Sequence, residues 1–436
     1  MQHYDVAESE GTLLLYHLYE LNQAALHPAR ATADAYRLLW RNPLNWASHT
    51  AMGRGAAAAL ELFERSTRRY RKPAWEIDTV EVDGAPVAVT PRTVLSKPFC
   101  NLVHFARDLP ETRRKKDPKV LVVAPMAGHF ATLLRGTVRD LLPDHDVYVT
   151  EWHDARFVPR AAGAFDLDVY IDYITEFLRY FGGDVHVMAV CQPTVPVFAA
   201  VSLMEAKRDR AVPRSMILMA GPIDARQSPT AVNRFATTKP LSWFRHNVIT
   251  QVPWPHPGMM RQVYPGFLQL SGFMGMNIDR HLNAHRDLFD NLIRGDGDSA
   301  DKHREFYDEF LAVMDLTAEY YLATIETVFL EHRLPKGEMT HRGVPVDPSK
   351  VHRVALMTVE GEKDDISGVG QTEAAQTLCK KLPDGLRAHH LQPGVGHYGV
   401  FNGSRFRSEI LPEIRGFIRA HQRPRSVLMR ALARVA

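Results

Sequence analysis

The feature that most constrains the fold is a regular alternation of short apolar segments and amphipathic segments between residues 119 and 221. Strands that are apolar along their whole length and are separated by helices are typical of a parallel sheet buried on both faces. The sequence therefore predicts an α/β protein with a mostly parallel central sheet. Its expected strands are KVLVVAPM (119–126), DVYVTEW (146–152), DVHVMAV (184–190) and SMILMAG (215–221).

The alternation stops after Asp224 and resumes at RVALMTVEG (353–361), which a helix and the strand LRAHHLQPG follow. The intervening sequence is rich in aromatic residues and methionine and then becomes helical in its spacing. Before Trp75 the apolar residues also recur at helical spacing, with Pro43 and Gly53 to Gly55 expected to interrupt them. Two strands joined by an Asp83-Gly84 turn follow. We therefore predict four parts: an N-terminal helical segment (1–74), a first core part (75–224), a mainly helical cap or lid (225–345) and a second core part (346–436).

The composition excludes several classes of protein. Fifty-three basic against 50 acidic residues give a net charge of only +3, with no long basic block, so nucleic acid is not expected as a partner. Three cysteines, far apart and odd in number, favour a reducing compartment and argue against disulfides or a zinc site. No metal is expected. The polar N-terminus does not resemble a secretory signal, and the apolar run 11–15 is too short to cross a bilayer. We expect a cytoplasmic protein without a transmembrane segment.

Cys191 directly follows the apolar strand 184–190 and directly precedes a helical segment. This order is that of the nucleophile elbow of α/β hydrolases, in which a sharp turn raises the nucleophile above the sheet. The helix N-terminus behind the turn favours a thiolate, the reactive form of cysteine. The usual Gly-x-Ser-x-Gly is here Ala-Val-Cys-Gln-Pro (189–193), without either glycine, so a buried structural thiol is the alternative. Cys100 and Cys379 have no elbow around them.

The downstream order fits an elbow enzyme, in which nucleophile, acid and histidine follow one another along the chain. Asp364 lies in the loop after the strand 353–361, and His397 lies in a glycine-containing loop before the last helix. We predict that Asp364 orients His397, and that His397 takes the thiol proton of Cys191. Asp365 is the alternative acid.

An acyl-transfer site also needs backbone donors for the developing oxyanion. We expect these donors to be the N–H of Gln192 and an N–H of the loop after the strand 119–126, from Met126 or Ala127. His129 in the same loop is a candidate substrate contact or a simple loop histidine.

These motifs resemble the intracellular poly(3-hydroxybutyrate) depolymerases, a group of polyhydroxyalkanoate depolymerases with Cys-Gln-Pro at the elbow. The resemblance implies an α/β-hydrolase fold and a Cys-Asp-His triad on Cys191, Asp364 and His397. It also implies cleavage of amorphous polyester at intracellular granules, with no required cofactor and with water or coenzyme A as acyl acceptor. The stretches that carry it are VMAVCQPTVPVFAA, APMAGHFATLLRGTVRDLLPDHDVYVTEWHDAR, MAGPIDARQSPTAVNRFA, TVEGEKDDISGVGQT and GVGHYGVFNGSRF.

Apolar side chains of the cap suit such a polyester, although they could equally form an ordinary lid core. The aromatic candidates are Trp243, Phe244, Trp254, Tyr264, Phe267 and Phe273, among which Trp243, Trp254 and Phe267 are our predicted substrate contacts. The basic and apolar tail 423–436 could lie on a granule surface or be a frayed end. A homo-oligomer is left open.

Three other functions remain open at this stage. A polyhydroxyalkanoate synthase-like acyltransferase uses the same triad but carries its nucleophile between glycines. A granule-associated protein without catalysis needs apolar surface and no triad. A hydrolase or acyltransferase of small esters is compatible with the same residues.

Overall fold

The computed structural model describes residues 4–114, 116–276 and 297–422. Within this part of the chain, the largest element is a nine-stranded sheet. Its strands are β1 (Thr79–Val82), β2 (Ala85–Lys97), β3 (Cys100–Arg107), β4 (Lys119–Val123), β5 (Asp146–Trp152), β6 (His186–Val190), β7 (Ser215–Met219), β13 (Ala355–Gly361) and β14 (Arg387–Gln392).

The strand order is β1-β2-β3-β5-β4-β6-β7-β13-β14. Strands from β5 to β14 in this order are all parallel, whereas β1, β2 and β3 are joined to one another and to β5 in antiparallel pairs. The inversion of β4 and β5, with helical crossovers between the parallel strands, is the topology of an α/β hydrolase. The structure thus confirms the fold class that the sequence predicted.

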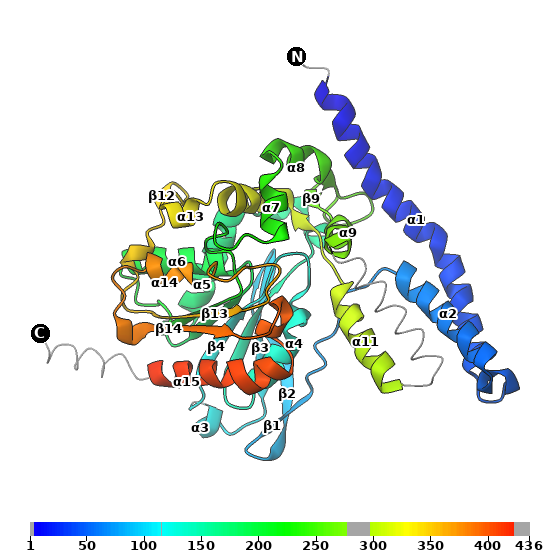
Figure 1. The fold of residues 1–436 in the computed structure, drawn as a ribbon, viewed down its shortest axis with the longest axis horizontal. Helices are drawn as coiled ribbons and strands as arrows, with labels where there is room; N and C mark the ends of the chain where they lie inside the picture. The colour runs from blue at the N-terminus through cyan, green and yellow to red at the C-terminus, as the bar shows by residue number, and fades with distance from the viewer. Residues whose placement is uncertain (1–3, 115, 277–296, 423–436) are drawn as a thin grey trace, which may run out of the picture.

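Helices cover both faces of this sheet. In Figure 1, α5 (Leu167–Tyr180), α6 (Thr194–Ala206) and α14 (Ala374–Leu378) lie on one face, and α4 (Arg135–Leu141) and α15 (Leu411–His421) lie on the other. Strands β6 and β7 are buried along their whole length, as their unbroken apolar sequence requires. Strand β3 was not among the predicted strands, because polar residues alternate with its apolar ones and its burial alternates accordingly.

The N-terminal segment forms α1 (Tyr4–Arg41), the short η1 (Trp46–His49) and α2 (Ala51–Thr67). The helix interruption expected at Gly53 to Gly55 was wrong, since both glycines lie inside α2. Glycine is required at position 53 for packing. A Cβ there would lie 1.9 Å from the carbonyl oxygen of Ala47, so the residue allows η1 to pack on α2. Figure 1 shows α1 running along the edge of the molecule, beside the segment inserted after β7.

The inserted segment between β7 and β13 contains most of the remaining elements. Its helices are α7 (Ala231–Thr237), α8 (Leu241–Asn247), α9 (Gly266–Met276), α11 (Gly297–Phe310), α12 (Ala318–Thr324), the π-helical η5 (Ile325–Leu330) and α13 (Arg333–Lys336). It also contains a small antiparallel sheet of β8 (Thr250–Gln251), β9 (Gln262–Tyr264) and β10 (Leu316–Thr317), and the strand pair β11 (Thr340–His341) and β12 (Val344–Pro345).

A buried polar contact ties α1 to this insertion. The Tyr16 hydroxyl donates to Asp315 Oδ2 at 2.6 Å, and both residues are buried. Asp315 Oδ1 in turn accepts the N–H of Gly266 at the start of α9. The N-terminal helix α1 therefore packs against the inserted segment. Among the described residues, no helix combines the length and the apolar character needed to cross a membrane.

Candidate active site

Cys191 occupies a sharp turn between β6 and α6. Its φ of +66° lies in the left-handed region, which a non-glycine residue adopts only at a cost of about 1–3 kcal/mol. The Cys191 N–H donates to the carbonyl oxygen of Met219 on the neighbouring strand β7 at 2.7 Å, which holds the turn in place. The side chain is partly exposed and lines a cavity. This is the strained strand-turn-helix geometry that the sequence predicted for a nucleophile elbow.

Gly221, just after the neighbouring strand β7, provides space at the elbow that glycines at positions 189 and 193 would otherwise provide. Both flanking positions of the elbow carry larger residues, Ala189 and Pro193. A Cβ on Gly221, just after β7, would lie 1.9 Å from Thr194 Oγ1 and 2.5 Å from the carbonyl oxygen of Cys191. Gly221 therefore allows the start of α6 to approach the end of β7 closely.

Asp364 and His397 lie in the loops after β13 and β14, and their side chains meet. His397 Nδ1 donates to Asp364 Oδ2 at 2.8 Å, and the Asp364 side chain has no exposed surface. Asp364 Oδ1 accepts the N–H groups of Ile366 and Ser367, each at 2.8 Å. These bonds fix the carboxylate, which in turn fixes the imidazole. The alternative acid, Asp365, is exposed and has no such contact with His397.

Cys191 and His397 line the same cavity, and the imidazole lies within interaction range of the thiol. Burial opposes protonation of His397, but attraction to the Cys191 thiolate and to Asp364 outweighs it and holds the pKa of His397 well above its usual range. His397 is therefore electrostatically suited to accept a proton. The three residues follow the carboxyl ends of β6, β13 and β14, parallel strands whose ends share one edge of the sheet.

The predicted oxyanion donors also lie at this edge. Gln192, Met126 and Ala127 line the cavity beside Cys191. In the described part of the chain, no hydrogen bond uses the backbone N–H of any of these three residues. These donors are therefore available to a developing negative charge.

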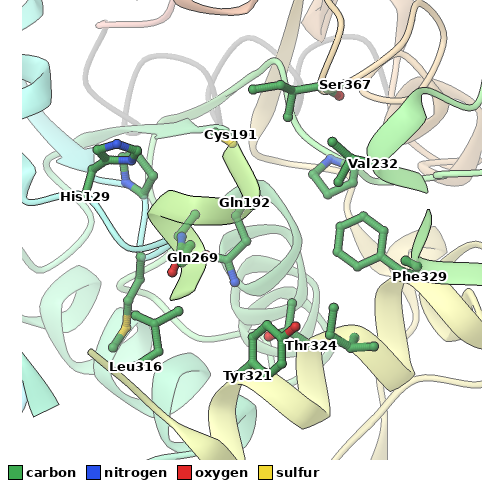
Figure 2. Close-up of a pocket in the computed structure, with 18 of the residues that line it drawn as sticks. His129, Cys191, Gln192, Val232, Gln269, Leu316, Tyr321, Thr324, Phe329 and Ser367 are labelled. Atoms are coloured by element: carbon green, nitrogen blue, oxygen red, sulfur yellow. The ribbon is translucent and has the colours of Figure 1, made fainter. Parts of the chain in front are cut away.

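The cavity has a volume of about 460 Å³ and is lined largely by apolar side chains of the core and of the inserted segment. Figure 2 shows Cys191 and Gln192 at its wall, with His129 and Gln269 toward one side and Val232 and Phe329 toward the other. Residues of the inserted segment that line it come from α7, α8, α9, α12 and η5. A cavity of this size and character suits an apolar acyl chain.

His129 lines the cavity, but its ring contacts the main chain of the inserted segment. The Nε2 atom lies 3.0 Å from the carbonyl oxygen of Phe310, and residue 129 forms a β-bridge with Val313. Burial lowers the pKa of His129 to about 4, so the ring is neutral near pH 7. The neutral imidazole thus connects the loop after β4 to the inserted segment.

The aromatic residues of the cap divide into two groups. Phe244 and Tyr264 line the cavity. The contacts predicted for Trp243, Trp254 and Phe267 are corrected here, because none of the three side chains lines it. Trp254 is 78% exposed, Phe267 packs against Tyr16 and Tyr19 of α1, and Trp243 packs on Phe235 and Phe244 from outside. Helical periodicity indicates a buried face but does not say which partner covers it. The side chain of Phe273 and the tail 423–436 lie outside the described residues.

The other two cysteines are unsuited to nucleophilic chemistry. Cys100 and Cys379 are fully buried. Burial raises the pKa of the Cys100 thiol well above its usual range and that of Cys379 to about 12.

One group of side chains in the described part could bring ligand atoms within 4.8 Å of one another: Glu360, Glu373 and His389. Glu360 already accepts the N–H groups of Gly370, Thr372 and Glu373. The group is therefore explained by its structural bonds.

Sequence reasoning missed several polar residues that line the cavity, namely Gln269, Tyr320, Thr324 and Ser367. Tyr320 and Thr324 are four residues apart and thus share one face of α12. That spacing was the available signal, but it could not indicate that the face lies over Cys191.

Comparison with known proteins gives one family match and a set of distant structural neighbours. Residues 220–422, a little under half of the chain, match a family model described as PHB de-polymerase C-terminus, where PHB is poly(3-hydroxybutyrate). No curated protein matches the chain. The matched segment includes Asp364 and His397, whereas Cys191 lies before it.

Solved structures that resemble the chain share little sequence with it. The 2-hydroxy-6-oxo-6-phenylhexa-2,4-dienoate hydrolase of Rhodococcus sp. strain RHA1 is 11% identical, with 76% of this chain and 99% of that chain covered and a TM-score of 0.39. The monoacylglycerol lipase of Paleococcus ferrophilus is 11% identical, with 70% and 96% covered and a TM-score of 0.39. A thermophilic esterase from Thermogutta terrifontis is 13% identical, with 79% and 98% covered and a TM-score of 0.38.

The strand order, the elbow and the loops that follow β13 and β14 define an α/β hydrolase. Within that class, residues 220–422 are similar to the family described as PHB de-polymerase C-terminus.

Proposed function

We propose that this hydrolase depolymerises poly(3-hydroxybutyrate) through a Cys191-Asp364-His397 triad and a covalent 3-hydroxyacyl thioester on Cys191. The single observation that carries the proposal is the position of His397, bonded to Asp364 at 2.8 Å and in interaction range of a cysteine with φ +66°. The chemistry rests on this geometry, and the polymer rests on the family match.

The first half of the reaction forms the thioester. His397 Nε2 takes the thiol proton, and the Cys191 thiolate adds to the ester carbonyl carbon. The negative charge on the carbonyl oxygen is stabilised by the N–H of Gln192 and by the N–H of Met126 or Ala127. When the tetrahedral intermediate collapses, the ester C–O bond breaks, and the departing alkoxide takes the proton from the imidazolium.

The second half releases the acyl group. His397 accepts a proton from water, the hydroxide adds to the thioester carbonyl, and the thiolate leaves and is reprotonated by the imidazolium. Coenzyme A could replace water as acceptor, because thioester exchange between two thiols needs no further group. No cofactor is required in either case.

We further propose that the enzyme acts in the cytoplasm on polymer granules. Apolar side chains such as Leu14, Leu18 and Leu21 lie on one face of α1, each at least 50% exposed, and provide a surface suited to an apolar polyester. The boundaries predicted for the arm (1–74), the lid (225–345) and the two core parts (75–224 and 346–436) remain our working division of the chain.

Incubation with amorphous poly(3-hydroxybutyrate), with products identified by mass spectrometry, tests the proposal. Wild-type protein should release hydroxy acid or its oligomers, and coenzyme A esters if thiolysis also occurs. Cys191→Ala should abolish turnover, whereas the buried Cys379→Ala should keep it. Turnover by Cys191→Ala refutes the nucleophile assignment. Net polymer gain from hydroxyacyl-coenzyme A would indicate a synthase, and polymer binding without turnover by wild type would indicate a non-catalytic granule protein.

A further inference from the structure

The cavity contains polar atoms that its apolar lining does not satisfy. Among the described residues, Gln192 Oε1, Tyr320 Oη and Thr324 Oγ1 are buried and make no hydrogen bond of regular geometry, although the Tyr320 hydroxyl interacts with the Gln192 and Thr324 side chains. All three residues line the cavity that holds Cys191. Burying a polar group with incomplete hydrogen bonding is unfavourable, so three such atoms in one place favour a polar ligand group that completes their bonds.

The side chains of Gln192, Tyr320 and Thr324 lie close together in the cavity that holds Cys191. Tyr320 lies within reach of the Gln192 and Thr324 side chains and interacts electrostatically with Cys191. Gln192 directly follows Cys191, and Figure 2 shows its side chain extending from the elbow toward the helix that carries Tyr321 and Thr324. The cluster therefore lines the cavity that an acyl group bound to Cys191 would occupy.

The hydrogen-bonding capacities of the three atoms restrict the chemical class of the ligand. Gln192 Oε1 only accepts, whereas the hydroxyls of Tyr320 and Thr324 can also donate. A ligand hydroxyl satisfies both kinds, since it donates to the amide oxygen and accepts from a hydroxyl. An ester oxygen only accepts, and a plain aliphatic chain does neither.

We propose that Gln192, Tyr320 and Thr324 form a recognition site for a free hydroxyl on the third carbon of the acyl group, and thus for the hydroxyl end of the polyester. Only the terminal unit of such a chain carries a free hydroxyl, because every internal 3-oxygen is esterified. The enzyme then removes units from that end. This inference rests on the proposed function, and its test separates the two.

The test compares three p-nitrophenyl esters: 3-hydroxybutyrate, 3-methoxybutyrate, which keeps the oxygen but cannot donate, and butyrate. Wild type should favour the hydroxy ester in kcat/KM. Tyr320→Phe and Thr324→Val should each reduce that preference by about tenfold, because each leaves the ligand hydroxyl with one fewer partner. The Phe variant keeps the ring that stacks on Tyr170, with centroids 5.5 Å apart, so the fold should persist.

Tyr321→Phe is the matched control. It removes a hydroxyl from the next residue of the same helix, which lines the cavity but is not in the cluster. Its hydroxy-to-methoxy ratio should equal that of wild type. Equal losses on all three esters in Tyr320→Phe, or no preference in wild type, overturn the recognition site.

A second experiment uses polymer whose hydroxyl ends are acetylated. Wild type should degrade it several-fold more slowly than uncapped amorphous polymer. Equal rates on the two polymers overturn end recognition while the proposed function stands. If neither polymer is degraded, the proposed function fails, and the ester ratios still decide whether the cluster recognises a hydroxyl.

Discussion

Asp364→Asn tests how the acid loop positions His397, and the structure predicts how the variant fails. Asp364 Oδ1 accepts two N–H groups, from Ile366 and Ser367, at 2.8 Å each. In the asparagine variant the amide oxygen must keep these bonds, because an NH₂ group cannot accept them. The NH₂ group is then directed at His397 Nδ1, where wild type has the Oδ2 acceptor at 2.8 Å.

A donor facing Nδ1 reverses the tautomer of His397. Nδ1 becomes the acceptor, so the neutral ring carries its proton on Nε2 and cannot take the thiol proton of Cys191. The variant also loses the buried negative charge that stabilises the imidazolium. We expect kcat to fall by at least ~10³, which corresponds to about 4 kcal/mol of lost transition-state stabilisation.

Asp365→Asn is the matched control, because it makes the same chemical change one residue later on an exposed side chain. The assay is release of p-nitrophenol from a 3-hydroxybutyrate ester under saturating substrate, with thermal unfolding as a check that both variants fold. We expect less than a threefold effect of Asp365→Asn. A folded Asp364→Asn protein with more than a tenth of wild-type kcat, or the reverse ranking of the two variants, would refute the reasoning.

Three further predictions concern stability. Burial lowers the pKa of His186 to about 4, so between pH 6.5 and 4 only the unfolded chain takes up the proton, and the free energy of unfolding falls as the pH falls. In urea unfolding, His186→Gln should therefore lose about 2 kcal/mol less of this free energy than wild type between pH 7 and 5. Equal losses in the two proteins would contradict this. Gly221→Ala places a Cβ 1.9 Å from Thr194 Oγ1, so we expect a lower melting temperature together with reduced kcat, and wild-type values for both would be inconsistent with the close packing. Tyr16→Phe leaves buried Asp315 without a 2.6 Å bond; α1 should be cleaved faster by limited proteolysis, and an unchanged rate would mean that this bond does not anchor the arm.

The fold was predictable because its signal is local. Strands β4, β5, β6, β7 and β13 coincide with mostly apolar segments that are buried on both faces of the sheet. The Asp83-Gly84 turn was predictable for the same reason, since both residues have positive φ, which asparagine, aspartate and glycine tolerate best. Strand β3 was missed because polar residues interrupt its apolar ones, and because its pairing with β5 depends on residues about 45 positions away in the sequence.

The candidate site was predictable in part. An elbow, an acid loop and a histidine loop each follow a strand, so the sequence pointed to Cys191, Asp364 and His397 as candidates. Chain order alone could not choose between Asp364 and Asp365. The choice came from the fold of one loop, in which backbone donors of Ile366 and Ser367 turn one carboxylate inward.

By itself, the sequence determined the alternating core, the position of the elbow and the order of the candidate residues, because these depend on periodicity and on residues adjacent in the chain. Only the tertiary structure decided which side chains of the inserted segment line the cavity that holds Cys191. Trp254 and Phe267 looked suitable by composition but point to solvent or to α1, whereas Tyr320 and Thr324 line the cavity. Amphipathic spacing specifies that a helix has a buried face, but the packing of distant segments decides what that face covers.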